Sequence, residues 1–135
     1  MKYQLTVTRK QLEVIGKITE LYSRLCMGQM GELRECRKDF FLQYDRATGV
    51  QQIVFPDLNP NQMYGINSPE IPEGARIAWD IYQVIRHFLA WENEHNTPAT
   101  RQWPEQFGVC YDDPMKTGSE PFAAINHFKE EKGEI

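Results

Sequence analysis

The residues best suited to chemistry in this chain are arginines that occur close to aromatic residues. Arg24 lies in a segment that contains a tyrosine, and Arg76 and Arg86 flank Tyr82 in a segment rich in aromatic residues. A guanidinium group can stack on a planar base and donate paired hydrogen bonds to a phosphate. Two simpler roles stay open, because Arg76 can pair with Asp80 one helical turn away and Arg86 can be a solvated edge.

Motifs for catalysis or metal binding are weak by comparison. Glu92 and His95 have the spacing of a carboxylate-bridged iron site, but the second copy that such a site needs is absent from the sequence. Cys26 falls on an expected core face, and aspartates follow Cys110, so neither thiol is expected to be a strong nucleophile. We therefore predict that the protein is not an enzyme and has no catalytic residue, no metal and no cofactor.

A first helix is predicted to begin after Thr8. Thr8 and Gln11 form a capping-box pattern, in which the two side chains satisfy free backbone N–H groups. Gly28 and Gly31 follow this helix, and they either end it or allow close contact with another backbone. The apolar stripe expected to face the core consists of Leu12, Ile15, Thr19, Tyr22 and Cys26, widened by Ile18 and Leu25.

The strongest helical pattern runs from about residue 72 to residue 94 without an internal proline. Pro72 suits the first turn, where its missing N–H costs nothing, and Glu73 complements the helix dipole. The apolar surface is wide enough for burial on more than one side, either within the fold or against a second subunit. The expected buried side consists of Ala78, Ile81, Tyr82, Ile85, Phe88 and Leu89, widened by Trp79, Val84 and Trp91.

Short strands are predicted at residues 3–7, 50–55 and 107–111, and the proline-rich residues 56–72 predict an irregular, ordered loop. Together these elements predict an α+β fold with two or three helices, in which a long central helix packs with a small antiparallel sheet. We expect one domain over residues 1–135, with a mobile tail at about residues 121–135.

Composition and charge exclude several classes of protein. Of the 135 residues, 41% are hydrophobic and 25% are charged, and the net charge is −4, whereas proteins that bind nucleic-acid polymers are basic. No apolar stretch approaches the ~20 residues of a membrane-spanning helix, and the N-terminus lacks the apolar core of a signal peptide. Three cysteines without paired spacing favour a reducing compartment. We therefore expect a cytoplasmic protein with neither a nucleic-acid polymer nor a membrane as partner.

Four segments resemble a family of small proteins encoded by phages and prophages, and the resemblance extends over residues 12–121. They are Tyr22-Ser-Arg-x-x-Met-Gly-Gln29, Tyr64-Gly-Ile-x-x-Pro69-x-Ile-Pro72-x-x-Ala-Arg76, Asp80-Ile-Tyr-Gln-Val-Ile-Arg-His87 with Leu89-Ala-Trp91, and Gly108-Val-x-Tyr-Asp-x-Pro-x-Lys116. The family is similar in size and layout to the Thoeris anti-defence proteins, phage sponges that oligomerise and hold cyclic ADP-ribose-type immune signals without cleaving them. The resemblance implies immune evasion in the cytoplasm of a host cell.

The predicted function is a phage anti-defence protein that sequesters a small cyclic nucleotide or cyclic ADP-ribose-type signal without cleaving it. We expect a homo-oligomer, with the long helix or the Gly28 region at its interface. The alternatives are a phage protein that binds and inhibits a host protein, which a flat surface without a pocket would favour, and a small hydrolase of nucleotide signals. The expected ligand-binding residues supply guanidinium groups, aromatic faces and amides; they are Arg24, Gln29, Tyr64, Asn67, Arg76, Tyr82 and Arg86.

Overall fold

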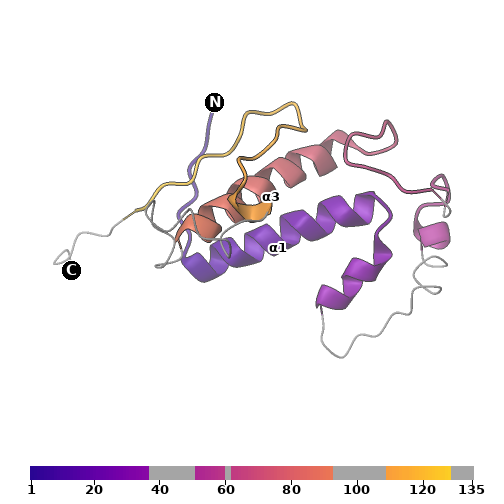
Figure 1. Ribbon diagram of the computed structural model, residues 1–135, viewed down its shortest axis with the longest axis horizontal. Coiled ribbons are helices and arrows are strands. Elements are labelled where there is room, and N and C mark those ends of the chain that lie inside the picture. The colour runs from indigo at the N-terminus through magenta and orange to yellow at the C-terminus, as the bar shows by residue number, and fades with distance from the viewer. Residues whose placement is uncertain (37–50, 60–61, 93–108, 129–135) are drawn as a thin grey trace.

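Two long helices run side by side in opposite directions (Figure 1). The computed structural model describes residues 1–36, 51–59, 62–92 and 109–128. Its elements are α1 (Arg9–Cys26), η1 (Met30–Cys36), α3 (Glu73–Glu92) and η3 (Val109–Tyr111), and residues 51–54 are also helical. α1 packs along α3, η1 contacts α1, and η3 contacts α3.

The ends of α1 follow from its sequence. The Gln11 N–H donates to Thr8 Oγ1 at 3.2 Å, and the Thr8 N–H donates to Gln11 Oε1 at 2.8 Å, so the predicted capping box is confirmed. Gly28 has a φ of +82°, a left-handed conformation that glycine adopts without strain just after a helix end. A Cβ at Gly31 would meet no atom within 4 Å. Of the two roles open for these glycines, Gly28 therefore ends the helix. The nearest atoms to a Cβ built on Gly28 belong to the Gln51 side chain, with Nε2 at 2.7 Å, and not to another backbone.

α3 confirms the second predicted helix over residues 73–92, while residues 93 and 94 lie outside the described residues. Of its expected buried side, Ala78 and Ile85 are buried and the other members are half-buried. α1 covers one side of α3, and residues 115–119 are hydrogen-bonded to another side through Asp80 and Gln83. Burial on more than one side therefore arises within a single chain.

Small residues line the contact between α1 and α3. A Cβ built on Gly16 would lie 3.0 Å from Ile85 Cγ2, and the fully buried Ser23 hydroxyl lies 2.8 Å from the Ala75 carbonyl oxygen. Ile18 and Tyr22, which we expected on the core side, are 59% and 47% exposed. The other members of the expected stripe are half-buried; they are Leu12, Ile15, Thr19, Leu25 and Cys26. The stripe therefore overlaps the contact face only in part, because the helices approach closest at Gly16 and Ser23, where their side chains are smallest.

The predicted α+β fold is wrong, because the described residues contain no strand. Residues 1–8 have no regular secondary structure, and Tyr3 and Leu5 are 87% and 78% exposed. Residues 51–54 are helical, with a hydrogen bond of 2.7 Å from the Phe55 N–H to the Gln51 oxygen, and residues 109–111 form a 3₁₀ helix. Val50 and residues 107–108 lie outside the described residues. A short alternating segment becomes a strand only beside another strand, and the described part of the chain offers none.

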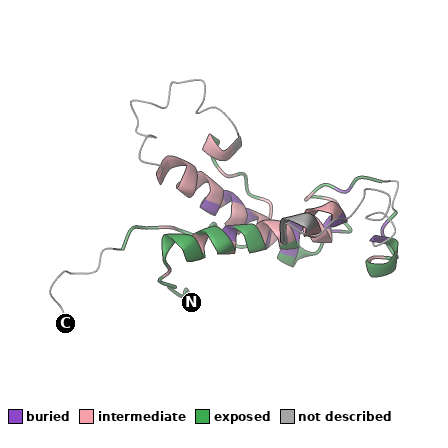
Figure 2. Cartoon of the chain, turned by 90° about the horizontal axis from the view of Figure 1, so that it is seen from below, coloured by how far each residue is buried: buried purple, intermediate pink, exposed green. Residues whose placement is uncertain are grey.

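The core lies where the end of α1, the start of α3 and the loop between them meet. Its buried members are Met27, Leu58, Tyr64, Ile71 and Ala75. Tyr64 and Ile71 anchor the loop, which is irregular and ordered as predicted at these positions, whereas Met63 is 97% exposed. Figure 2 shows that the outer face of α1 is mostly exposed.

None of the described helices is both long and apolar enough to cross a membrane. Of the predicted tail, residues 121–128 are described and have no regular secondary structure.

Candidate functional site

Four side chains form a stacked row between the last turns of α1 and the middle of α3. The Arg24 guanidinium carbon lies 5.3 Å from the ring centre of Trp79, and the rings of Trp79 and Tyr82 are 5.0 Å apart. The guanidinium carbon of Arg86 lies 4.9 Å from the ring centre of Tyr82. Trp79, Tyr82 and Arg86 share one face of α3 because they are spaced by three and four residues. We call Arg24, Trp79, Tyr82 and Arg86 the stacked row.

Polar contacts join the same residues into a continuous chain. Arg86 Nη1 lies 3.5 Å from the Tyr82 hydroxyl, which is hydrogen-bonded to Glu20. Arg24 donates from Nε to Glu20 Oε2 at 3.1 Å and from Nη1 to Gln29 Oε1 at 3.0 Å. Burial raises the pKa of Tyr82, and the hydrogen bond to Glu20 raises it further, against the opposing effect of Arg86. The phenol therefore stays protonated at neutral pH.

Two buried nitrogen atoms at one end of the row have no hydrogen-bond partner among the described residues. They are Arg86 Nε and His87 Nδ1. The other ring nitrogen of His87 lies 3.8 Å from Asp113 Oδ1. Buried polar atoms in native proteins are nearly always paired, so such atoms indicate either an ordered water or a bound group.

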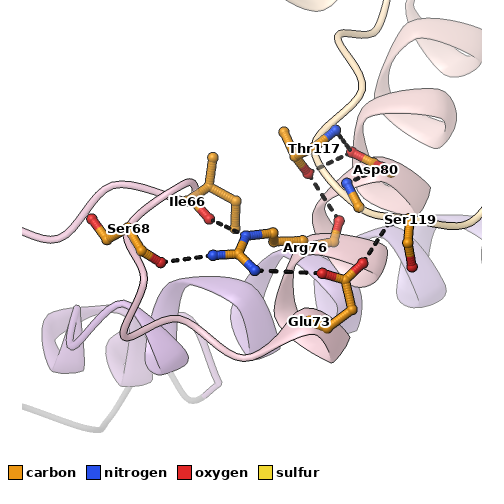
Figure 3. A network of polar contacts seen from close by, with 8 residues as sticks. Ile66, Ser68, Glu73, Arg76, Asp80, Thr117 and Ser119 are labelled. Carbon is orange, nitrogen blue, oxygen red and sulfur yellow. Dashed lines mark hydrogen bonds and ion pairs between the residues drawn. The ribbon is translucent and has the colours of Figure 1, made fainter.

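The remaining predicted binding residues lie elsewhere, in the loop before α3 and in the first turn of α3. Arg76 donates from Nε to the Ile66 oxygen at 3.0 Å and from Nη2 to the Ser68 oxygen at 2.7 Å (Figure 3). Its Nη1 lies 3.4 Å from Glu73 Oε2, so the pairing with Asp80 that the sequence left open does not form. Arg76 therefore holds a loop in place.

The two other predicted residues in this region do not join the stacked row either. Tyr64 is buried, and its hydroxyl accepts a hydrogen bond of 2.8 Å from the Asn59 N–H, while Asn67 is exposed. The structure thus brings together four of the seven predicted residues, Arg24, Gln29, Tyr82 and Arg86, and leaves Tyr64, Asn67 and Arg76 apart from them.

Sequence reasoning missed Glu20 and the binding potential of Trp79. Glu20 and Arg24 are four residues apart, a spacing that pairs opposite charges on a helix. Apolar periodicity places Trp79 only on the wide apolar surface of α3, although its spacing from Tyr82 and Arg86 also places it in the same row. Both signals were local and could have been found.

On another side of α3, Asp80 and Gln83 hold residues 115–119, which we call the strap. Asp80 Oδ1 accepts hydrogen bonds from the Thr117 N–H at 2.9 Å and hydroxyl at 2.6 Å, and Asp80 Oδ2 accepts from the Gly118 N–H at 2.8 Å (Figure 3). Gln83 accepts from the Met115 N–H at 2.9 Å and donates to the Met115 oxygen at 2.7 Å. These contacts resemble those of a bound extended peptide, supplied here by the chain itself.

A cavity of about 150 Å³ lies between α3 and the residues that follow the strap. It contains none of the predicted binding residues; its lining consists of Ile77, Asp80, Ile81, Glu120, Pro121 and Ala123. Pockets for small organic ligands usually measure about 300–1,000 Å³. This cavity is therefore too small for a nucleotide.

Nothing in the described residues forms a group of three or more side chains suited to hold a metal ion. Glu92 instead lies 2.6 Å from His127, between Oε1 and Nε2. Burial raises the pKa of the Cys26 thiol, which lowers the fraction of reactive thiolate at neutral pH.

Comparisons with protein-family models, curated proteins and solved structures found no match.

Proposed function

We propose that the protein binds and holds a small nucleotide-derived anion without cleaving it, and that the stacked row forms one wall of the binding site. The observation that carries this proposal is the convergence of Arg24, Gln29, Tyr82 and Arg86 around Trp79. Together with the resemblance to phage proteins, this chemistry supports a role in sequestering an immune signal in the host cytoplasm.

The row offers the chemistry that such a ligand needs. Two guanidinium groups stand at its ends, and aromatic rings lie between them. The buried Arg86 Nε, which lacks a partner among the described residues, can donate a charge-assisted hydrogen bond to a phosphate oxygen. Gln29 adds an amide suited to a sugar hydroxyl.

The row is half-buried, so a second wall is needed to enclose a ligand. We propose that a second copy of the chain supplies it, as in a two-fold homo-oligomer whose sites lie between subunits. A site between two chains can be large enough for a nucleotide, although the cavity beside α3 within one chain is too small. Enclosure also removes water, which strengthens contacts between charged groups.

Native mass spectrometry of the purified protein with cyclic nucleotides and cyclic ADP-ribose isomers tests this proposal. We expect an oligomer that retains one class of ligand with unchanged mass, whereas a changed ligand mass would indicate a hydrolase. For the retained ligand, calorimetric titration should show at least a roughly ten-fold loss of affinity in Arg24→Ala and in Arg86→Ala, since a charge-assisted contact contributes about 1.5–3 kcal/mol.

Arg9→Ala is the matched control for Arg24→Ala. Arg9 pairs with Glu13 through Nε at 3.3 Å, four residues apart, as Arg24 does with Glu20, but it is exposed and makes no aromatic contact among the described residues. Its substitution should leave ligand affinity unchanged. Unchanged affinity in both test variants would refute the site, and unfolding of both would assign the two arginines a structural role.

The second candidate function is recognition of another protein. The specific observation in its favour is a line of apolar residues on the outer face of α1, in which Val14, Ile18 and Tyr22 are each about half exposed. Exposed apolar patches bordered by polar residues are typical of interaction sites. Loss of binding to a partner on substitution of Ile18, with ligand binding intact, would separate this function from the first.

A further inference from the structure

The outer face of α1 carries an apolar line that the described residues cover only at one end, where a Cβ built on Gly74 would lie 3.2 Å from the Tyr22 hydroxyl. Val14, Ile18 and Tyr22 are 53%, 59% and 47% exposed, and their spacing of four residues places them along one side of the helix. The line is about 12 Å long, given the rise of an α-helix. This length is two turns, enough to contact a facing helix.

Lysines border this line on one side. Lys10 and Lys17 are exposed and seven residues apart, so they lie on the same flank of α1. Neither makes an ion pair within the described residues, whereas Glu13 on this helix is already paired with Arg9 at 3.3 Å. The face is therefore apolar with a basic edge, on a chain whose net charge is −4.

A second copy of α1 fits this face poorly. In an antiparallel pair of α1 helices centred on Ile18, two-fold symmetry brings the same flank of both helices to the same side. The two Lys17 residues then differ in height by only about 3 Å along the helix axes. A parallel pair sets Lys17 against the flank that carries Ile15 and Thr19, where no acidic residue answers it. The antiparallel pair is disfavoured by repulsion between lysines, and the parallel pair leaves the lysines without an acidic partner. Self-association through α1 is therefore disfavoured.

A lipid surface also fits poorly. Helices that lie on membranes present a large apolar face and bind anionic lipids through basic residues. Here the exposed apolar line holds only three residues, and the net charge of −4 opposes approach to an anionic bilayer.

We infer that this face binds an acidic amphipathic helix of another protein, an inference that rests on the second candidate function. Apolar residues of the partner contact Val14, Ile18 and Tyr22, in the way that amphipathic helices dock onto apolar surfaces. Acidic residues seven positions apart on one flank of the partner face Lys10 and Lys17. The partner is therefore recognised by its charge pattern as well as by its apolar residues.

Two synthetic helical peptides of about 20 residues test the inference. Both carry the same apolar face, and one has glutamates on its flank where the other has lysines. Fluorescence anisotropy should show that the native protein prefers the acidic peptide by about five- to ten-fold, the sum expected of two exposed charge pairs. The double variant Lys10→Glu, Lys17→Glu should reverse this preference, and Ile18→Gln should weaken binding of both peptides.

The double variant Lys2→Glu, Ile53→Gln is the control, because it makes the same kinds of change at exposed positions outside α1, with Ile53 81% exposed. It should bind both peptides as the native protein does. Circular dichroism should show every variant folded, because each altered side chain is exposed.

The other outcomes overturn the inference in distinguishable ways. Equal binding of both peptides that is lost in Ile18→Gln would keep protein recognition by α1 but refute the acidic class of partner. If neither peptide binds, the protein-recognition function of this face fails as well. Sedimentation showing self-association, or flotation with phosphatidylserine vesicles, either one abolished by Ile18→Gln, would assign the face to a second copy or to a membrane instead.

Discussion

Asp80→Asn should release the strap from α3. Asp80 is 4% exposed and accepts three hydrogen bonds of 2.6–2.9 Å, two at Oδ1 from Thr117 and one at Oδ2 from Gly118. Asparagine replaces one of these oxygens with an NH₂ group, which is a donor. The new NH₂ group then faces either the Gly118 N–H or the N–H and hydroxyl of Thr117, all of which are donors. At least one buried hydrogen bond is therefore lost.

The magnitude follows from the number and type of these bonds. A hydrogen bond to a charged group contributes about 1.5–3 kcal/mol, and a buried donor left unpaired costs about 1–3 kcal/mol. The contributions are not additive, because the strap can detach from α3 and its backbone can bind water. We therefore expect Asp80→Asn to lower the free energy of unfolding by about 2–4 kcal/mol, which corresponds to roughly 7–14 °C in Tm for a chain of this length.

Thermal unfolding and limited proteolysis together measure this effect. Lys116 lies within the strap, so trypsin should cleave after it faster when the strap detaches. Asp113→Asn is the matched control, because the Asp113 side chain is 99% exposed and the same chemical change there should leave both readouts unaltered. An Asp80→Asn protein with the native Tm and the native rate of cleavage at Lys116 would refute the reasoning.

Three further changes test contacts around the same helices. Gly118→Ala should speed cleavage at Lys116, because the new Cβ would lie 2.9 Å from the Ile77 nitrogen and backbone cannot yield as a side chain can; an unchanged rate would contradict this. Gly16→Val should lower Tm, since a Cβ there already lies 3.0 Å from Ile85 Cγ2, whereas Gly31→Ala, with open space around it, should not. Hydrogen bonds from the side chain and backbone of Ser119 lower the pKa of Glu73 below 4.5, so its stabilising effect is present above that pH and is lost as the pH falls through the lowered pKa. Glu73→Gln should reduce the fall in Tm between pH 5 and pH 3, and an unaltered profile would show that Glu73 does not contribute.

The two long helices could be predicted because their signals are local. The capping box of Thr8 and Gln11 and the uninterrupted periodicity after Pro72 depend on neighbours within a few residues, and both helices form where these signals place them. The strands failed for the opposite reason. Alternation at Tyr3 and Leu5 is also local, but a strand needs a partner elsewhere in the chain, and one sequence does not show whether that partner exists.

The candidate site was half predictable on the same grounds. Arg24 and Gln29 are close in sequence, as are Tyr82 and Arg86, so each pair was within reach of motif reasoning. Which pairs meet depends on the packing of α1 against α3. The guanidinium of Arg76 shares its chemistry with these residues, yet the fold directs it to the carbonyl oxygens of a loop.

The packing that assembles the stacked row depends on residues that carry no functional signal. Gly16 lets α1 approach Ile85, and Ser23 hydrogen-bonds to the Ala75 oxygen, which fixes how the two antiparallel helices are aligned. With this alignment Arg24, the residue after Ser23, lies over Trp79, one turn beyond Ala75. An apolar-stripe analysis counts large residues, and here it selected Ile18 and Tyr22, which the close contact leaves outside. The exposed line on α1 and the stacked row thus have one cause, because the side of α1 that packs on α3 is its small-residue side.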